Sequence, residues 1–278
     1  MSCDLRVFDV MAFGRFAPDR LRTGFDPAPR TTTPAIEEMI AAEWDRRVDE
    51  ARGRNVLLFN GALYRYVAHR LDGTGAEATL ELVVGNTCYR DFVGTNLHNH
   101  HRLAEFPWNC FANPIGTTAT LMTTDGRIVY GRRSERVAYH ASHVHTFGGA
   151  LEPSDRDNDG HIDAFGSVIR ELNEELGLIP EDIREIVAVG LVRDREIRQP
   201  ELLFEAHVLL SFAELNARWN NAKARDEHVE LVALPAQPDA VVPFIRSCGP
   251  IAPVAVAGLL LFGRCRWGER WYDSAMAS

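Results

Sequence analysis

The sequence predicts a mixed α/β fold in two domains. The chain has 278 residues, whereas a typical domain has about 150. Hydrophobic residues make up 46% and charged residues 25%, a composition of folded globular proteins that argues against a disordered or collagen-like chain. Runs with strand character precede a helical run and then follow it, as in layered α/β folds. We place an N-terminal α+β domain, rich in strands, at 1–109 and a second domain at 110–278.

The N-terminal domain is expected to contain one helix and a small antiparallel sheet. Residues 1–32 are rich in Arg, Pro, Asp and Thr and predict an irregular arm with short ordered pieces. Thr33 is a suitable N-cap with Pro34 at the first helical position, so a helix should run to about Arg52. Turn signals separate three strand-like runs. These runs are 56–59, 64–71 and 79–84. We interpret 98–113 as a linker or surface loop.

The second domain alternates strands and helices. A hairpin is predicted around Asp125-Gly126. Its strands are 120–123 and 128–132, further strands are 186–193, 202–210 and 231–234, and helices are 164–176, 212–222 and 254–273. This order favours a mixed sheet that is covered by helices.

Charge and cysteine content exclude several classes of protein. Thirty Lys and Arg against 39 Asp and Glu give a net charge of −9, which argues against binding along a nucleic-acid backbone. The longest apolar run, 251–262, contains a proline and is too short to span a bilayer. The N-terminus has no apolar signal-peptide core, and the five scattered cysteines form no CxxC pair. We therefore expect a reduced, cytoplasmic protein without membrane partners; the sequence leaves its oligomeric state open.

The helix predicted at 164–176 gathers carboxylates on one face. Glu171, Glu174 and Glu175 are spaced i, i+3 and i+4, and Gly177 is a natural C-terminal cap. The apolar residues on the other face are Phe165, Ile169, Leu172 and Leu176. Three close carboxylates repel one another, and a bound Mg²⁺ removes that repulsion. The preceding pair Gly148-Gly149 allows the backbone to approach a phosphate or a metal closely. The pattern therefore suits metal-assisted attack of water on phosphorus.

The segment 149–178 resembles the Nudix box. That box reads Gly, five residues, Glu, seven residues, then Arg-Glu-aliphatic-x-Glu-Glu-x-Gly-aliphatic. Positions 170–178 match its second half throughout. In the first half, Asp155 stands where the family has Glu, and fourteen residues separate it from Arg170 instead of seven. The simplest interpretation is a seven-residue insertion before the helix.

The resemblance implies both a fold and residue roles. The fold is the Nudix α/β/α sandwich over 110–278, with the N-terminal domain contributing to substrate selection. Glu171, Glu174 and Glu175 would hold Mg²⁺, or Mn²⁺ in its place, with the Gly149 carbonyl as a further ligand. Arg170 would orient the carboxylates, and Arg170 and Glu174 are the implied catalytic residues.

A second motif is similar to a signature of the eukaryotic Nudix branch that cleaves UDP-glucose and UDP-galactose. It is Tyr89-Arg90-Asp91-Phe92-x-Gly94-Thr95-Asn96, and Gly148-Gly149-x-x-Glu152-Pro153 also fits that branch. The implied substrate-binding residues are Tyr89, Arg90, Asp91, Thr95 and Asn96. The alternative is that the aromatic residues belong to the core and that Arg90 and Asp91 form a structural ion pair.

The expected activity is hydrolysis of a nucleotide sugar to UMP and sugar 1-phosphate. The general base stays open among Glu174, Glu201, Glu205 and Glu227. Two alternatives are the same chemistry on another nucleoside diphosphate derivative, such as ADP-ribose or a dinucleotide, and a ligand sensor of Nudix fold without catalysis. The three intact box glutamates disfavour the sensor.

Two further patterns are ambiguous. Residues 155–163 follow the first nine positions of an EF-hand calcium loop, but position twelve is Gly166, so we favour a plain acidic turn over a Ca²⁺ site. Histidines cluster at 98–101 and 140–145. A zinc site or a positioning role near the phosphates is conceivable there, and ordinary hydrogen-bonded histidine is favoured.

Overall fold

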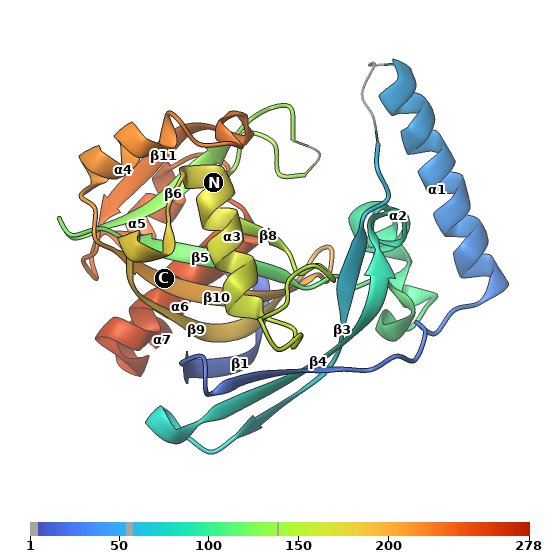
Figure 1. The fold of residues 1–278 in the computed structure, drawn as a ribbon, viewed down its shortest axis with the longest axis horizontal. Coiled ribbons are helices and arrows are strands. Elements are labelled where there is room, and N and C mark those ends of the chain that lie inside the picture. Colours follow the sequence, from blue (N-terminus) through green and yellow to red (C-terminus); the bar gives the residue numbers. More distant parts are fainter. Residues whose placement is uncertain (1–4, 54–57, 138) are drawn as a thin grey trace.

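The computed structural model describes residues 5–53, 58–137 and 139–278, and its larger sheet has eight strands (Figure 1). The main path runs β1-β9-β10-β5-β6-β11, with β7 paired to β6 and β8 paired to β5. Only β10 and β5 are parallel neighbours; the other pairs of this sheet are antiparallel. The strands are β1 (Phe8–Phe16), β5 (Gly116–Met122), β6 (Arg127–Arg133), β7 (Val144–His145), β8 (Phe147–Ala150), β9 (Ile183–Asp194), β10 (Pro200–Val208) and β11 (His228–Pro235).

A fork in this sheet places the glycine pair. Strands β5 and β6 pair only at Leu121–Val129 and Met122–Ile128, next to the predicted Asp125-Gly126 turn. Beyond these pairs the strands separate, since β8 pairs with β5 and β7 pairs with β6. The fork therefore brings Gly148 and Gly149, on β8, into the sheet beside Thr117 and Thr118.

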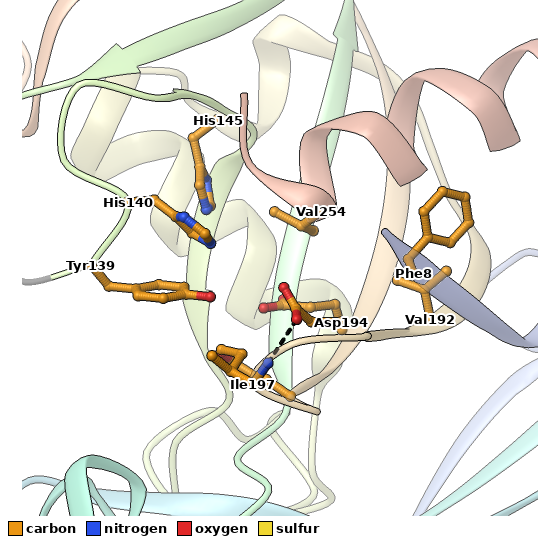
Figure 2. A pocket seen from close by; sticks show the side chains of 10 residues that line it. Phe8, Tyr139, His140, His145, Val192, Asp194, Ile197 and Val254 are labelled. Carbon is orange, nitrogen blue, oxygen red and sulfur yellow. Dashed lines mark hydrogen bonds between the residues drawn. The ribbon is translucent and has the colours of Figure 1, made fainter. Parts of the chain in front are cut away.

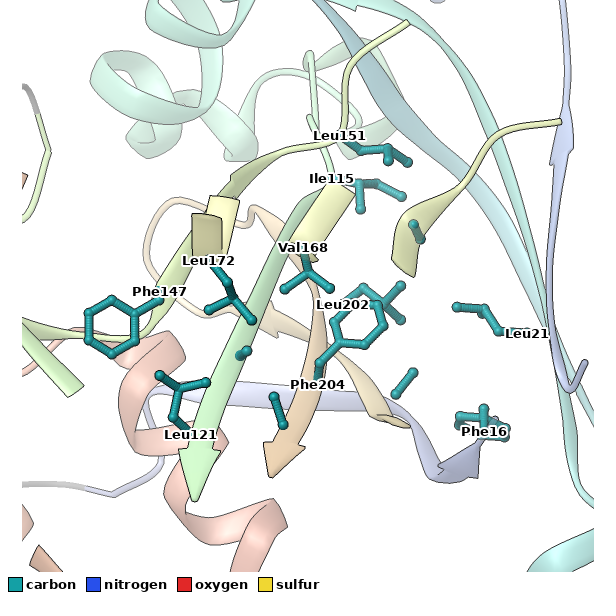
Figure 3. Close-up of a cluster of buried hydrophobic side chains, with 14 of the residues drawn as sticks. Phe16, Leu21, Ile115, Leu121, Phe147, Leu151, Val168, Leu172, Leu202 and Phe204 are labelled. Atoms are coloured by element: carbon teal, nitrogen blue, oxygen red, sulfur yellow. The ribbon is translucent and has the colours of Figure 1, made fainter. Parts of the chain in front are cut away.

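Helices cover both faces of the larger sheet, which confirms the predicted α/β/α sandwich. One face carries α3 (Ala164–Leu176) and α4 (Phe212–Trp219), and the other carries α5 (Val241–Ser247), α6 (Pro253–Trp267) and α7 (Glu269–Ala277). Side chains of a strand alternate between faces, so Leu202 and Phe204 on β10 pack toward α3 while Leu203 packs toward α6. Figure 3 shows Val168 and Leu172 of α3 over Leu121 and Phe204.

The smaller sheet has the order β2-β4-β3. Its strands are β2 (Leu21–Phe25), β3 (Ala62–Asp72) and β4 (Thr79–Cys88), and the nearby helices are α1 (Pro34–Gly53) and α2 (Tyr89–Phe92). Single helical turns occur at Gly75–Glu77, Val93–Leu97, His100–Ala104, Trp108–Cys110, Pro180–Asp182 and Arg225–Glu227. The inner face of this sheet belongs to the same hydrophobic core as α3, through Tyr64, Leu80 and Leu82. The two sheets are therefore packed together.

The prediction of an irregular arm at 1–32 is wrong, because this segment contains β1 and β2. Strand β1 pairs with β9, but its register shifts between Val10 and Ala12 and again between Phe13 and Phe16. These bulges interrupt the alternation by which a strand is recognised in a sequence. Strand β2 pairs with β4 in parallel, so the smaller sheet is mixed and not antiparallel. The division at residue 109 stays a prediction, although β1 joins the larger sheet from the N-terminal side.

Most other predicted elements are confirmed, with four differences. The helix predicted at 254–273 is two helices, because Gly268 at φ 88° interrupts it. The helix predicted at 212–222 ends at Trp219. The linker at 98–113 is not wholly on the surface, since Cys110–Asn113 are buried. Residues 56 and 57 of the strand predicted at 56–59 lie outside the described residues, and the prediction is wrong for Leu58 and Phe59, which are in no strand. Within the described part of the chain, no helix is long and apolar enough to cross a bilayer.

Candidate functional site

Helix α3 is held at both ends by the signals that its sequence contains. The Asp163 side chain accepts the N–H of Gly166 at 2.9 Å, and Gly177 adopts the left-handed cap conformation at φ 70°. The apolar face buries Val168, Leu172 and Leu176 completely. This packing turns the three box glutamates toward β8 and the helical turn at Arg225–Glu227.

Glu175 is the most deeply placed carboxylate of the box. Its side chain is 2% exposed, Oε2 accepts the N–H of Gly148 at 3.0 Å, and Oε1 lies 3.6 Å from Nε2 of His228. Burial raises the pKa of Glu175 to about 8, and the negative charge of Glu227 adds to this rise. Because little positive charge lies near this buried carboxylate, a cation bound at this position would stabilise its ionised form.

Glu171 lies directly against Gly149. A Cβ on Gly149 would be 2.3 Å from Oε1 of Glu171, so only glycine leaves room for this carboxylate beside the backbone. Burial raises the pKa of Glu171 to about 7; Arg170 opposes the rise, and Glu175 and Glu174 add to it. The structure thus brings the predicted ligands Glu171 and Gly149 together.

Gly148 is required by the close approach of two strands. Its φ is 148°, and a Cβ there would lie 2.1 Å from the carbonyl oxygen of Thr117. On the helix side, Oγ1 of Thr117 and Oγ of Ser167 are 3.0 Å apart, which fastens β5 to α3. Glycine at 148 therefore allows β8 to present a backbone N–H to Glu175.

Arg170 is anchored by the acidic residue that departs from the box consensus. Nε of Arg170 donates to Oδ1 of Asp155 at 3.0 Å, and Asp155 is only 6% exposed. The N–H of Asp163 donates to the Asp155 carbonyl at 3.0 Å, so residues 156–162 loop out between them. This loop has the length of the insertion inferred from the spacing. Asp155 thus reaches Arg170 despite the insertion, and Arg170 donates onward to Glu171 at 2.7 Å.

Glu174 is the most accessible of the three glutamates. Its oxygens lie 3.6 Å from Nη1 of Arg170 and 3.5 Å from Nζ of Lys223, and its side chain is 36% exposed. Nη1 of Arg170 contacts both Glu171 and Glu174 and therefore bridges these two carboxylates. The three carboxylates and the Gly149 carbonyl offer only oxygen donors, the chemistry that Mg²⁺ or Mn²⁺ prefers. In this structure the oxygens of the three carboxylates do not all come within 4.8 Å of one another, so an ion would have to draw them together.

The loop that resembles an EF-hand is an acidic turn in this structure. Oδ1 of Asp157 accepts the N–H groups of Asp159 and His161, and Gly160 has φ 85°. Among the described residues, these three side chains are the only group of three or more potential ligands whose atoms all lie within 4.8 Å of one another. All three are exposed, and the bonds inside the turn account for their proximity.

The four candidates for the general base occupy different environments. Glu205 is paired with Arg15 at 3.0 Å and His207 at 2.5 Å, toward β1. Glu201 packs against Gly116, and burial and Asp194 raise its pKa to about 8. Of the charged neighbours of Glu175, Glu227 has the largest effect and raises the pKa of Glu175, so Glu227 adjoins this carboxylate. Glu174 and Glu227 are therefore the candidates beside the carboxylate cluster.

A second buried polar cluster lies at the end of β9 and β10. It surrounds a cavity of about 10 Å³, enough for one water molecule. Figure 2 shows Tyr139, His140 and His145 on one side of this cavity and Asp194 across from them. Burial lowers the pKa of His140 to about 3, so the ring is neutral at pH 7. A zinc site is not preformed here, because no three ligands of the described residues meet at this cavity within bonding reach of one ion.

The motif at 89–96 is largely built into the fold. Asp91 pairs with Arg30 at 3.0 Å and lies 3.5 Å from Arg90. Thr95 and Asn96 are fully buried, and Asn96 binds Asn113 and the Ile197 carbonyl. This arrangement matches the alternative of a structural ion pair beside the core. Substrate contact stays a prediction for these residues, and burial argues against it for Thr95 and Asn96.

One neighbour of the site has no signal in the sequence. His228 starts β11, is 1% exposed, and stacks edge-on against Phe147 with ring centroids 5.2 Å apart. Its ring occupies the space above Gly131, where a Cβ would lie 2.3 Å from Nδ1. Only the pairing of β11 with β6 brings this histidine to Glu175.

Comparison of the sequence with known proteins finds several relatives. Nudix hydrolase 9 of Arabidopsis thaliana is 28% identical over 214 residues, covering 64% of this chain and 65% of that protein. The uridine diphosphate glucose pyrophosphatase NUDT22 of Mus musculus is 27% identical over 212 residues, covering 69% and 68%. The chain is a homologue of these two proteins. The match spans about two thirds of these relatives, and no family model matches the chain.

Solved Nudix structures resemble only part of the chain. A Nudix hydrolase from Alicyclobacillus acidocaldarius gives a TM-score of 0.38 at 14% identity, covering 59% of this chain and 96% of that one. A MutT protein from Methanosarcina mazei gives 0.34 at 19% identity, covering 55% and 94%.

Proposed function

We propose that this protein is a Mg²⁺- or Mn²⁺-dependent pyrophosphohydrolase of nucleotide sugars, with UDP-glucose or UDP-galactose as substrate and UMP and sugar 1-phosphate as products. The observation that supports it best is the placement of the half-buried Glu171 and the buried Glu175, whose carboxylates face Gly149 and Gly148. The mouse relative is a uridine diphosphate glucose pyrophosphatase, which supports the choice of a uridine diphosphate sugar.

The side chains around the box have separable tasks in this proposal. A divalent ion, when bound, neutralises the pyrophosphate and makes water a better nucleophile. Gly148 holds Glu175 through its N–H, and Asp155 holds Arg170, which orients Glu171. The predicted metal ligands are Glu171, Glu174, Glu175 and the Gly149 carbonyl. Because a general base must reach water, the more accessible Glu174 and the adjacent Glu227 are preferred over Glu201, whose Oε2 is buried, and over the ion-paired Glu205.

A substrate panel tests the proposal. The purified protein is incubated with UDP-glucose, UDP-galactose, ADP-ribose and a dinucleotide, with Mg²⁺ or with a chelator, and nucleoside monophosphate release is measured. Metal-dependent UMP release from the UDP sugars is the expected result. Preference for ADP-ribose or the dinucleotide would favour the first alternative, and tight nucleotide binding without turnover would favour the sensor.

Variants connect the activity to the box. Glu174→Gln and Glu175→Gln should each abolish turnover while the far-ultraviolet circular dichroism is unchanged. Glu181→Gln is the matched control, because Glu181 is exposed and lies beyond the cap of α3. Full activity in either box variant would refute the metal-site assignment.

A reduced, cytoplasmic setting is part of the proposal. Cys88, Cys110, Cys248 and Cys265 are free thiols among the described residues. This state supports a compartment that keeps thiols reduced.

A further inference from the structure

Arg133 differs from the other arginines of the chain. Within residues 5–53, 58–137 and 139–278 it is the only arginine that is not fully exposed and yet makes no side-chain hydrogen bond, ion pair or ring contact. Its Nε is buried without a partner. The other arginines without such contacts are exposed; they are Arg22, Arg136, Arg184, Arg246 and Arg270.

Strand pairing directs this side chain toward the box. Arg133 is the last residue of β6, and it stands opposite His228 in the pairing with β11. Residues two apart on a strand share a face, so Arg133 lies on the same face as Gly131, over which the His228 ring sits. His228 is in turn 3.6 Å from Glu175. The Arg133 side chain therefore leaves β6 on the face that His228 covers, and His228 adjoins Glu175.

The charge of Arg133 reaches both polar clusters. It lowers the pKa of Glu175 in the box. It also lowers the pKa values of four groups around the small cavity, which are Tyr139, His140, His145 and Glu201. No carboxylate of the described residues approaches it within 4.0 Å, so this charge is not used in a structural ion pair. A partly desolvated guanidinium without an anion is costly unless a ligand supplies the anion.

We propose that Arg133 is an anion-binding residue beside the box and takes the phosphate oxygens of a diphosphate ligand. The guanidinium fork matches two phosphate oxygens, and the neighbouring box carboxylates repel the same group unless a cation covers them. This inference rests on the proposed function for the identity of the diphosphate, but anion binding by Arg133 can be measured without turnover.

The experiment measures binding of inorganic pyrophosphate to the full chain in a chelator at pH 6.5 by ³¹P NMR titration. Arg133→Gln should weaken binding at least about 10-fold, or about 1.4 kcal/mol, because a charged hydrogen-bonding pair is lost. Arg136→Gln is the control, since Arg136 is exposed and also lacks an ion pair, and should bind as the wild type does. Arg133→Lys keeps the charge but not the fork, so its affinity should lie between the two.

Several outcomes decide the matter. Wild-type protein that does not bind pyrophosphate, or Arg133→Gln protein that binds it equally well, would overturn the inference. If Arg133→Gln does not fold, Arg133→Lys decides, and unchanged binding in that variant overturns it. Pyrophosphate binding that depends on Arg133, in a protein that hydrolyses no nucleotide sugar, would leave the inference standing and remove the proposed function.

Discussion

Metal binding should depend steeply on pH, because two of the predicted ligands hold protons near neutrality. The pKa of Glu171 is raised to about 7 and that of Glu175 to about 8. A divalent ion binds the ionised forms, so it must displace both protons. Below each pKa every pH unit changes the affinity about tenfold per proton, and the apparent association constant should therefore rise roughly 500-fold from pH 6 to pH 8.

The assay is titration of the protein with Mn²⁺, without substrate, followed by electron paramagnetic resonance at pH 6, 7 and 8. Calorimetry in buffers of different ionisation enthalpy should show release of about two protons at pH 6 and fewer than one at pH 8. Asp157→Asn is a control, because Asp157 lies in the exposed turn. An affinity that changes less than threefold over this range, or that falls as pH rises, would refute the reasoning.

Two further predictions concern the supports of the site. Gly148→Ala should lower the free energy of unfolding, measured by urea denaturation, by about 2–4 kcal/mol, because its Cβ would collide with the Thr117 carbonyl. Gly53→Ala is the control, since Gly53 has open space around it, and should lower this free energy by less than about 1 kcal/mol. Equal unfolding midpoints for the two variants would contradict this account. Asp155→Asn should lower the free energy of unfolding by about 3 kcal/mol and weaken Mn²⁺ binding, because it leaves the Arg170 guanidinium without its buried carboxylate partner. Unchanged Mn²⁺ affinity would show that Arg170 does not depend on Asp155.

Local patterns predicted the elements whose signals lie within a few residues. Helix α3 has the predicted bounds 164–176, since its N-cap, apolar spacing and terminal glycine are all contiguous. Strand β1 was missed because its bulges break the alternation and its partner β9 lies more than 160 residues away. The motif at 89–96 was recognisable as a pattern, but the amino-acid sequence does not show that Thr95 and Asn96 are buried and bound to other protein groups.

The sequence by itself determined the carboxylate face of α3, its C-terminal cap and the glycine pair, because helix periodicity and backbone freedom are local properties. It also determined the length of the insertion between Asp155 and Arg170, through spacing alone. Only the tertiary structure decided that Asp155 pairs with Arg170, that His228 lies beside Glu175, and that Arg133 has no anion of its own. Such relations depend on strand pairing and burial between distant segments, and these are properties of the packed chain.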